Sequence, residues 1–376
     1  MVIKYALMSQ VTQFHNLSHI FISLIGAILL LAIYYNIRKR FYQVLEEGNT
    51  IKRVDKGLLY LSFGMLVWVF SGSWAFIANH FNFEETLSYQ IGVNLLSTFN
   101  NLFWLLALYY VYDAPKFIYR NEKNVKIIAT IIIVVASITL LLSFSLGTKI
   151  YYGVKLTSIP DVLLTTFLCF LMAVSFFRTF MHRDLKLVAF IAVFAIFLLF
   201  ISQLSDVFTQ LNNNFFNHLI RVITKTSLVA VFLVLATSWV IQLAHTPKPN
   251  EMKISFLDWS LIELTIPSKG IINEKIDFGS KTTQYRNLLN FAFKRKYMLA
   301  NEQSIKVCYG GEIKSQTYVT RIIDNINAIL QLPQDSKLER KDIITFIGES
   351  KYRLRILPQN IFIEEALLNE FKKNKS

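Results

Sequence analysis

Residues 187–208 read LVAFIAVFAIFLLFISQLSDVF, and positions 187–201 of this stretch are all apolar. A helix needs roughly 20 apolar residues to cross a hydrocarbon core about 30 Å thick, so the stretch predicts a transmembrane helix. In the whole chain 53% of the residues are hydrophobic and 17% are charged, whereas soluble domains are about one quarter charged. Lipid is therefore the expected solvent for part of this chain.

Similar apolar runs occur repeatedly before Pro247 and stop after it. They predict seven spans, at residues 17–37, 58–79, 91–112, 127–146, 159–180, 187–208 and 219–243. We expect a membrane domain at 1–245, a linker at 246–255 and a separate C-terminal domain at 256–376. The predicted fold class is a membrane all-α seven-helix bundle followed by a small α+β domain.

Basic residues are concentrated in alternate connections between the predicted spans. The first, third and fifth connections contain Arg38, Lys39, Arg40, Lys52, Arg53 and Lys56, then Lys116, Arg120, Lys123 and Lys126, then Arg178, Arg183 and Lys186. The other connections contain only Lys149 and Lys155. Cytoplasmic loops carry an excess of Lys and Arg, so we expect integration in the cell (inner) membrane, with the N-terminus outside and the C-terminal domain in the cytoplasm.

Polar side chains inside the spans are costly and mark candidate functional positions. Two groups recur at helical spacing: one in the third span with Asn94, Ser97, Thr98 and Asn101, and one in the seventh with His218, Arg221 and Lys225. From these and from the ends of spans five and six, the candidate sensing residues are Asn94, Asn101, Asp161, Gln203, Asp206, Arg221 and Lys225. They predict an ionic cluster, which either holds the bundle together or lines a pocket for a small molecule.

Nothing in the sequence indicates an enzyme, a cofactor or a metal centre. Cys169 and Cys308 cannot form a disulfide framework and lack metal-ligand spacing. The C-terminal domain has no glycine-rich nucleotide loop of either common form, and no histidine for a Ser/His/Asp triad. With 20 Lys and Arg against 15 Asp and Glu after residue 250, its charge is compatible with nucleic acid without requiring it.

The C-terminal domain is predicted to contain a small sheet, three helices and a hairpin. Strands at 260–266 and 271–278 are joined by the turn sequence PSKG. Helices are expected at 280–296, as a short helix at 301–309, and at 315–330, where Val319, Ile322, Ile323 and Ile326 form an apolar stripe. Two strands around a tight turn at 348–350 follow.

This order and three local motifs resemble the winged-helix DNA-binding output domains of OmpR/PhoB-type response regulators. Residues 298–311, MLANEQSIKVCYGG, resemble the second helix of that family, and 317–330, TYVTRIIDNINAIL, resemble its recognition helix. The wing is similar to ITFIGESKYRL at 344–354, with matches at Thr345, Gly348, Tyr352, Arg353 and Leu354. The likeness covers about 100 of the 376 residues.

The resemblance implies that the helix reads base edges and that the wing contacts phosphate. The wing arginine of the family is replaced by Ile347, and its Leu-Arg pair by Ile326 and Asn327. The candidate DNA-binding residues are Thr317, Thr320, Arg321, Asn325, Asn327, Lys351 and Arg353, with Arg355 as a further donor.

We therefore expect a membrane-embedded one-component transcriptional regulator, with lipid and DNA as partners, in the form of a homodimer. The alternative is a seven-transmembrane receptor whose C-terminal domain docks a partner signalling protein in the cytoplasm.

Overall fold

The computed structural model describes residues 2–47, 54–83, 86–111, 113–119, 121–147, 152–208, 214–348 and 350–373. The chain divides into two compact units, Met1–Ile37 with Val54–Trp239 and Arg38–Arg53 with Val240–Ser376. The first is a helix bundle and the second is built around the C-terminal domain.

The long helices are α1 (Val2–Glu47), α2 (Val54–His80), α3 (Leu87–Tyr110), α4 (Glu122–Leu146), α5 (Ile159–Met181), α6 (Lys186–Val207) and α7 (Asn214–Ala244). Each contains a segment long and apolar enough to cross a membrane. The predicted number and order of the apolar helices are therefore confirmed.

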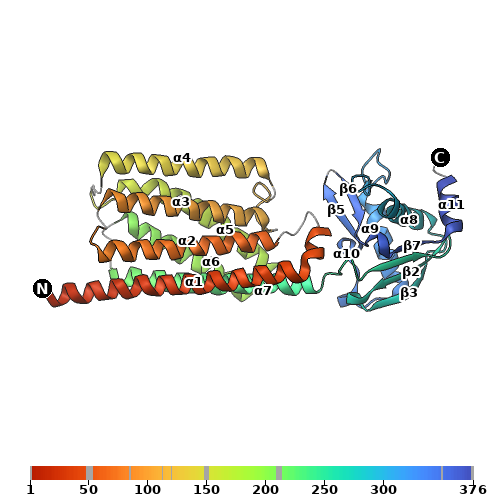
Figure 1. Ribbon diagram of the computed structural model, residues 1–376, viewed down its shortest axis with the longest axis horizontal. Helices are drawn as coiled ribbons and strands as arrows, with labels where there is room; N and C mark the ends of the chain where they lie inside the picture. The colour runs from red at the N-terminus through yellow and green to blue at the C-terminus, as the bar shows by residue number, and fades with distance from the viewer. Residues whose placement is uncertain are drawn as a thin grey trace. The chain divides into compact units, whose positions relative to one another are not determined.

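Helix α3 lies at the centre of one side of the bundle, where it packs against α2, α4 and α5, while α6 packs against α5 (Figure 1). Glycines allow α1 and α2 to approach closely: a Cβ on Gly26 would lie 2.8 Å from Met65 Sδ, and one on Gly72 would lie 2.8 Å from Ile20 Cγ1. Small residues commonly permit this kind of approach between membrane helices. Apolar side chains such as Phe190 and Leu141 point outward from the bundle, as lipid-facing residues do.

The C-terminal domain contains two sheets. The first consists of β1 (Lys253–Phe256), β2 (Leu261–Ile266), β3 (Ile271–Asp277) and β7 (Ile361–Ile363), in the order β3-β2-β1-β7. Its pairs are antiparallel except for β7, which runs parallel to β1. The second sheet has β4 (Ile305–Lys306), β6 (Lys351–Leu354) and β5 (Ile344–Gly348), in the order β4-β6-β5 and antiparallel throughout.

Helices α8 (Thr282–Tyr297) and α9 (Gln316–Leu330) share one hydrophobic core with both sheets, and α10 (Arg340–Ile343) and α11 (Glu365–Lys373) complete the domain (Figure 1). The predicted stripe of α9 is buried, from Val319 at 0% exposure to Ile323 at 2%. The C-terminal domain is thus α+β, as predicted, and the strands at PSKG, the helices α8 and α9 and the late hairpin are in the predicted places. Of the hairpin turn, Glu349 lies outside the described residues.

The prediction of a short helix at 301–309 is wrong. Its place is taken by β4 and by turns on either side. Ile305 and Val307 are buried on either side of exposed Lys306, which is the alternation of a strand, and Ile305 pairs with Tyr352 of β6. A turn then closes through the Gly311 N–H to the Cys308 carbonyl, with Gly310 at φ +79°. Segment 301–309 is too short for a stable helix, and it pairs instead with the edge of the hairpin.

Strands β1 and β7 and helices α10 and α11 were also not predicted. Strand β1 begins within the segment expected to be a linker. The strand residues Ile254 and Phe256 are buried, and β7 joins them from more than a hundred residues further along the chain. The preceding segment is also bonded to the domain, because Asn360 donates from Nδ2 to the Asn250 and Met252 carbonyls. The stretch of chain between the end of α7 and the first residues bonded to the C-terminal domain is therefore short.

Candidate functional site

A small cavity lined by both polar and apolar side chains lies between α2, α3, α5 and α6 of the helix bundle. Its volume is about 40 Å³. It is lined by Trp68, Asn100, Asn101, Trp104, Thr165, Leu168, Cys169, Met172, Leu199 and Gln203. Of the predicted sensing residues, Asn101 and Gln203 line it directly.

One hydrogen bond between α3 and α5 and one within α3 hold the polar wall of this cavity. Asn101 donates from Nδ2 to Thr165 Oγ1 at 3.5 Å, and Trp104 Nε1 donates to Asn100 Oδ1 at 2.7 Å. The Oε1 atom of Gln203 is buried and accepts from none of the described residues. A water needs about 10–15 Å³ and drug-sized ligands need about 300–1,000 Å³, so the cavity suits water or a very small polar solute in this conformation.

Three more of the predicted sensing residues, Asp161, Arg221 and Lys225, lie in separate contacts within the bundle. Ser97 Oγ on α3 lies 2.9 Å from both carboxylate oxygens of Asp161 on α5. Arg221 donates from Nε to Ser202 Oγ at 3.1 Å. The Lys225 ammonium lies 5.2 Å from the ring centre of Trp68, which also lines the cavity. These contacts join α3 to α5, α6 to α7 and α2 to α7.

A further candidate, Asn94, lies between α3 and α4. Asn94 on α3 donates from Nδ2 to the Ala136 carbonyl of α4 at 2.9 Å, so it serves helix packing. The side chains of Asp206 and His218 lie outside the described residues, and the predicted ionic cluster therefore stays a prediction. Trp68 and Trp104 could not be selected from the sequence, because aromatic residues are common in membrane spans. Asn100 could have been selected, because it is a polar residue beside Asn101 in an apolar span.

In the C-terminal domain, α9 presents a polar face on the side opposite its apolar stripe. Thr317, Thr320 and Arg321 are exposed there. Asn325 is only 4% exposed and accepts at Oδ1 from Lys281 Nζ, so it is not part of that face. Its expected place on the exposed side was wrong, because it faces α8's N-terminal end.

The side chain of Asn327 is hydrogen-bonded to the loop that follows α9. Its Nδ2 donates to the Leu338 carbonyl and its Oδ1 accepts from the Leu338 N–H, both at 2.9 Å. Such a pair of bonds to one backbone unit stabilises the loop, as a backbone pair in a sheet would. The exposed polar face of α9 is therefore narrower than the sequence suggested.

The basic residues of the hairpin divide into two kinds. Lys351 and Arg353 are half-buried on β6. Arg355, expected as a further donor to DNA, is 2% exposed, and its guanidinium donates to the carbonyls of Pro247, Lys341 and Asp342 at 2.9–3.1 Å. That expectation is wrong, because the guanidinium of Arg355 is buried and bonded to three backbone carbonyls.

Among the described residues, no group of three or more His, Cys, Asp and Glu is placed to hold a metal ion. No protein-family model matches the chain, and no curated protein or solved structure is similar enough to count as a match.

Proposed function

We propose that this chain is a membrane-embedded one-component transcriptional regulator. In this proposal the helix bundle, with its cavity, senses a small molecule or a membrane state, and the C-terminal domain acts as a winged helix that binds DNA. The N-terminus lies outside the cell and the C-terminal domain in the cytoplasm, as the distribution of Lys and Arg indicates.

The observation that carries the proposal is the surface of α9 and the β5–β6 hairpin. Helix α9 exposes Thr317, Thr320 and Arg321, which are side chains able to hydrogen-bond to base edges. The hairpin that corresponds to the wing carries Lys351 and Arg353, which suit phosphate. A buried apolar stripe fixes α9 against the core, so that its polar side is held at one orientation.

A signal from the last span could reach this surface through Arg355. Pro247, three residues after the end of α7, is bonded to Arg355 Nη2 at 2.9 Å. The same guanidinium is bonded to α10, which leads directly into β5, and the Arg355 N–H donates to the Ile343 carbonyl. A displacement of Pro247 would therefore alter the hydrogen bonds of Arg355 at the base of the β5–β6 hairpin.

One observation favours the second candidate, a receptor whose C-terminal domain docks a partner protein. On the exposed side of α9, Asp324 offsets Arg321, and the exposed Ile329 adds an apolar contact near the end of the helix. A neutral, partly apolar face is more typical of a protein interface than of a DNA-binding one.

Binding of the full chain to DNA tests the proposal. The chain in lipid nanodiscs is titrated with duplex fragments from upstream of its own gene, at about 50 mM and about 200 mM salt. We expect affinity to fall steeply with salt, because phosphate contacts release counterions. Arg321→Ala should weaken binding by about 1–3 kcal/mol.

The matched control is Arg286→Ala, which removes an exposed arginine from α8 and should leave the affinity unchanged. Absent binding, or binding that is equal at both salt concentrations, would reject the DNA proposal. Co-purification of a protein that is lost in Arg321→Ala would then support the docking alternative.

A further inference from the structure

The end of the first apolar helix carries three consecutive basic residues. Helix α1 contains a segment of 27 residues, Asn16–Tyr42, that is long and apolar enough to cross a membrane, and Arg38, Lys39 and Arg40 lie near its end, all three exposed. Roughly 20 apolar residues cross the hydrocarbon core of a bilayer. In a membrane, residues this close to the end of the segment therefore lie at the level of the lipid headgroups.

The helix directs these basic side chains away from its buried side. Ile37 and Phe41, four residues apart, are 1% and 6% exposed. Successive residues of an α-helix are rotated by about 100°, so Lys39 points away from the side on which Ile37 and Phe41 lie. Tyr42 is 49% exposed, and tyrosines of this kind are enriched at the membrane–water interface. The exposed side of this segment thus has the composition of a headgroup-level surface.

Helix α1 departs from helical geometry directly after the basic residues. Phe41 has φ −117° and ψ 20°, whereas an α-helix has values near −63° and −42°. The straight part of α1 therefore ends where its basic side chains are.

No acidic residue lies near these basic residues in the sequence of α1. The first 45 residues of the chain contain no Asp or Glu. Lys39 and Arg40 thus have no acidic neighbour three or four residues away in either direction, which is the spacing at which charges on a helix interact. Among the residues that the structure describes, neither side chain takes part in a salt bridge.

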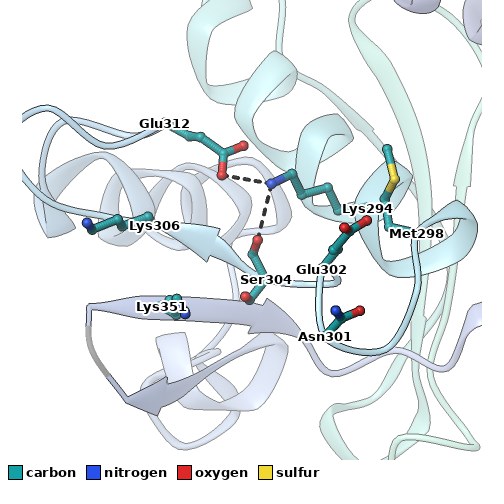
Figure 2. A pocket seen from close by; sticks show the side chains of 8 residues that line it. All are labelled: Lys294, Met298, Asn301, Glu302, Ser304, Lys306, Glu312 and Lys351. Atoms are coloured by element: carbon teal, nitrogen blue, oxygen red, sulfur yellow. Dashed lines mark hydrogen bonds and ion pairs between the residues drawn. The ribbon is translucent and has the colours of Figure 1, made fainter.

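A pocket of the C-terminal domain shows the opposite arrangement. Its volume is about 290 Å³, and Figure 2 shows Lys294 in its lining, with the ammonium 2.7 Å from Glu312 Oε1 and 3.3 Å from the Ser304 carbonyl. Glu302 adds a second carboxylate to the same lining. This pocket presents acids together with its lysines, whereas the end of α1 presents basic side chains without acids. The end of α1 is therefore the better surface for an anion.

We propose that Lys39 and Arg40 bind the headgroup of an anionic phospholipid, whose acyl chains lie beside the apolar part of α1. A guanidinium can donate two parallel hydrogen bonds to a phosphate, and the lysine ammonium adds a second positive charge. Phosphatidylcholine has the same phosphate, but its quaternary ammonium cancels the negative charge, so the site distinguishes lipids by net charge. The cytoplasmic leaflet, where the distribution of Lys and Arg places this end of α1, is the leaflet rich in anionic lipids. Lipid binding here does not depend on whether α9 binds DNA.

Native mass spectrometry of the full chain in a neutral detergent tests the proposal. The chain is titrated at low salt with phosphatidylglycerol, with phosphatidylcholine of the same acyl chains, and with glycerol 3-phosphate. A basic residue near an anionic lipid contributes about 1 kcal/mol, which corresponds to about fivefold in affinity. We expect saturable binding of phosphatidylglycerol and at least tenfold weaker binding of phosphatidylcholine, because two basic residues contribute.

Lys39→Gln and Arg40→Gln should each weaken binding of phosphatidylglycerol by about fivefold. Lys116→Gln is the matched control, because Lys116 is an exposed lysine in the connection between α3 and α4 and should not affect this site. The thermal midpoint of Lys39→Gln without added lipid should equal that of the unmodified chain, because Lys39 is exposed. An unchanged midpoint separates a lost site from a lost fold.

The proposal is overturned if phosphatidylcholine binds as tightly as phosphatidylglycerol, or if Lys39→Gln and Arg40→Gln bind phosphatidylglycerol like the unmodified chain. An equal loss in Lys116→Gln would show a general attraction of basic loops to anionic lipid and would overturn a site on α1. Glycerol 3-phosphate that displaces phosphatidylglycerol at equal concentration would assign the site to a free phosphate ester and overturn the lipid as its source.

Discussion

The helix bundle and the C-terminal domain use their buried polar side chains differently. In the bundle, Ser62, Ser175 and Thr179 each donate to the carbonyl four residues earlier in their own helix, at 2.6–2.8 Å. In the C-terminal domain, Arg355 bonds to a carbonyl 108 residues away, and Arg295 donates to the Ile356 carbonyl 61 residues away. Polar contacts are mostly local in the first region and long-range in the second.

The difference follows from how each region satisfies its backbone. Membrane helices bond their own N–H and C=O groups internally, so a buried hydroxyl adds little to what the helix already provides. In the C-terminal domain, short strands and turns leave carbonyls without a partner in regular structure, and buried carbonyls need a donor. Buried arginines can supply several donors at once. Loss of a polar side chain should therefore cost more in the C-terminal domain than in the bundle.

The largest effect is expected for Arg355→Met. This substitution keeps an apolar stem but leaves the carbonyls of Pro247, Lys341 and Asp342 without their donor, and we expect a loss of about 3 kcal/mol in the stability of the C-terminal domain. Hydrogen exchange of the β5 and β6 amides in the full chain measures this loss. Arg286→Met, at an exposed position of α8, should change it by less than about 0.5 kcal/mol. Equal exchange in the two variants would show that Arg355 does not hold the domain together.

A smaller effect is expected where the bundle does use a contact between helices. Ser97→Ala removes the hydroxyl that bonds to Asp161, and polar contacts between membrane helices contribute on average about 0.6 kcal/mol and at most about 1.7 kcal/mol. We expect a loss of about 1 kcal/mol, measured by thermal unfolding in nanodiscs. Ser137→Ala is the matched control, because Ser137 is exposed and bonds within its own helix α4, to the Ile133 carbonyl. A loss as large for Ser137→Ala would contradict the importance of contacts between helices.

The same difference explains what could be predicted from the sequence. The seven helices could be predicted from apolar runs alone. Lipid offers no hydrogen-bond partners, so a segment in it must bond its own backbone groups, as a helix does. Asn101 and Gln203 were found because a polar residue is conspicuous in an apolar run. The cavity they share with Trp68 could not be found, because it depends on how α2, α3, α5 and α6 pack.

In the C-terminal domain the periodic helices α8 and α9 were found, and the elements that depend on distant partners were missed. Strand β7 has three residues and exists because β1 lies beside it. Segment 301–309 became a turn and an edge strand because β6 offers Ile305 a partner. Arg355 was taken for an exposed donor because a basic residue after a strand is usually exposed, whereas three distant carbonyls hold it inside.

The smallest effect concerns Asp342, a buried acid of the C-terminal domain. Its Oδ2 accepts from the Glu339 N–H at 2.9 Å and lies 3.7 Å from Lys269 Nζ. Burial nevertheless raises the pKa of Asp342 above its usual 3.8, because the charged carboxylate is desolvated. Between 3.8 and the raised pKa the folded chain binds more protons than the unfolded chain, so the stability contributed by Asp342 falls as pH rises through that window.

Asp342→Asn keeps an oxygen that accepts from the Glu339 N–H and removes this fall of stability with pH. We expect the free energy of unfolding to change by less than about 1 kcal/mol. Hydrogen exchange measures the urea midpoint of the C-terminal domain between about pH 4 and about pH 6. As pH increases, this midpoint should rise in the variant relative to the unmodified chain. Asp277 is the opposite case, because the Gly279 N–H and the Ser260 hydroxyl lower the pKa of its exposed carboxylate. The stability contributed by Asp277 is present above pH 3.8 and is lost as pH falls through the lowered pKa, so Asp277→Asn should show no such rise. Parallel curves for Asp342→Asn and the unmodified chain would mean that Lys269 and the Glu339 N–H fully compensate the burial of Asp342.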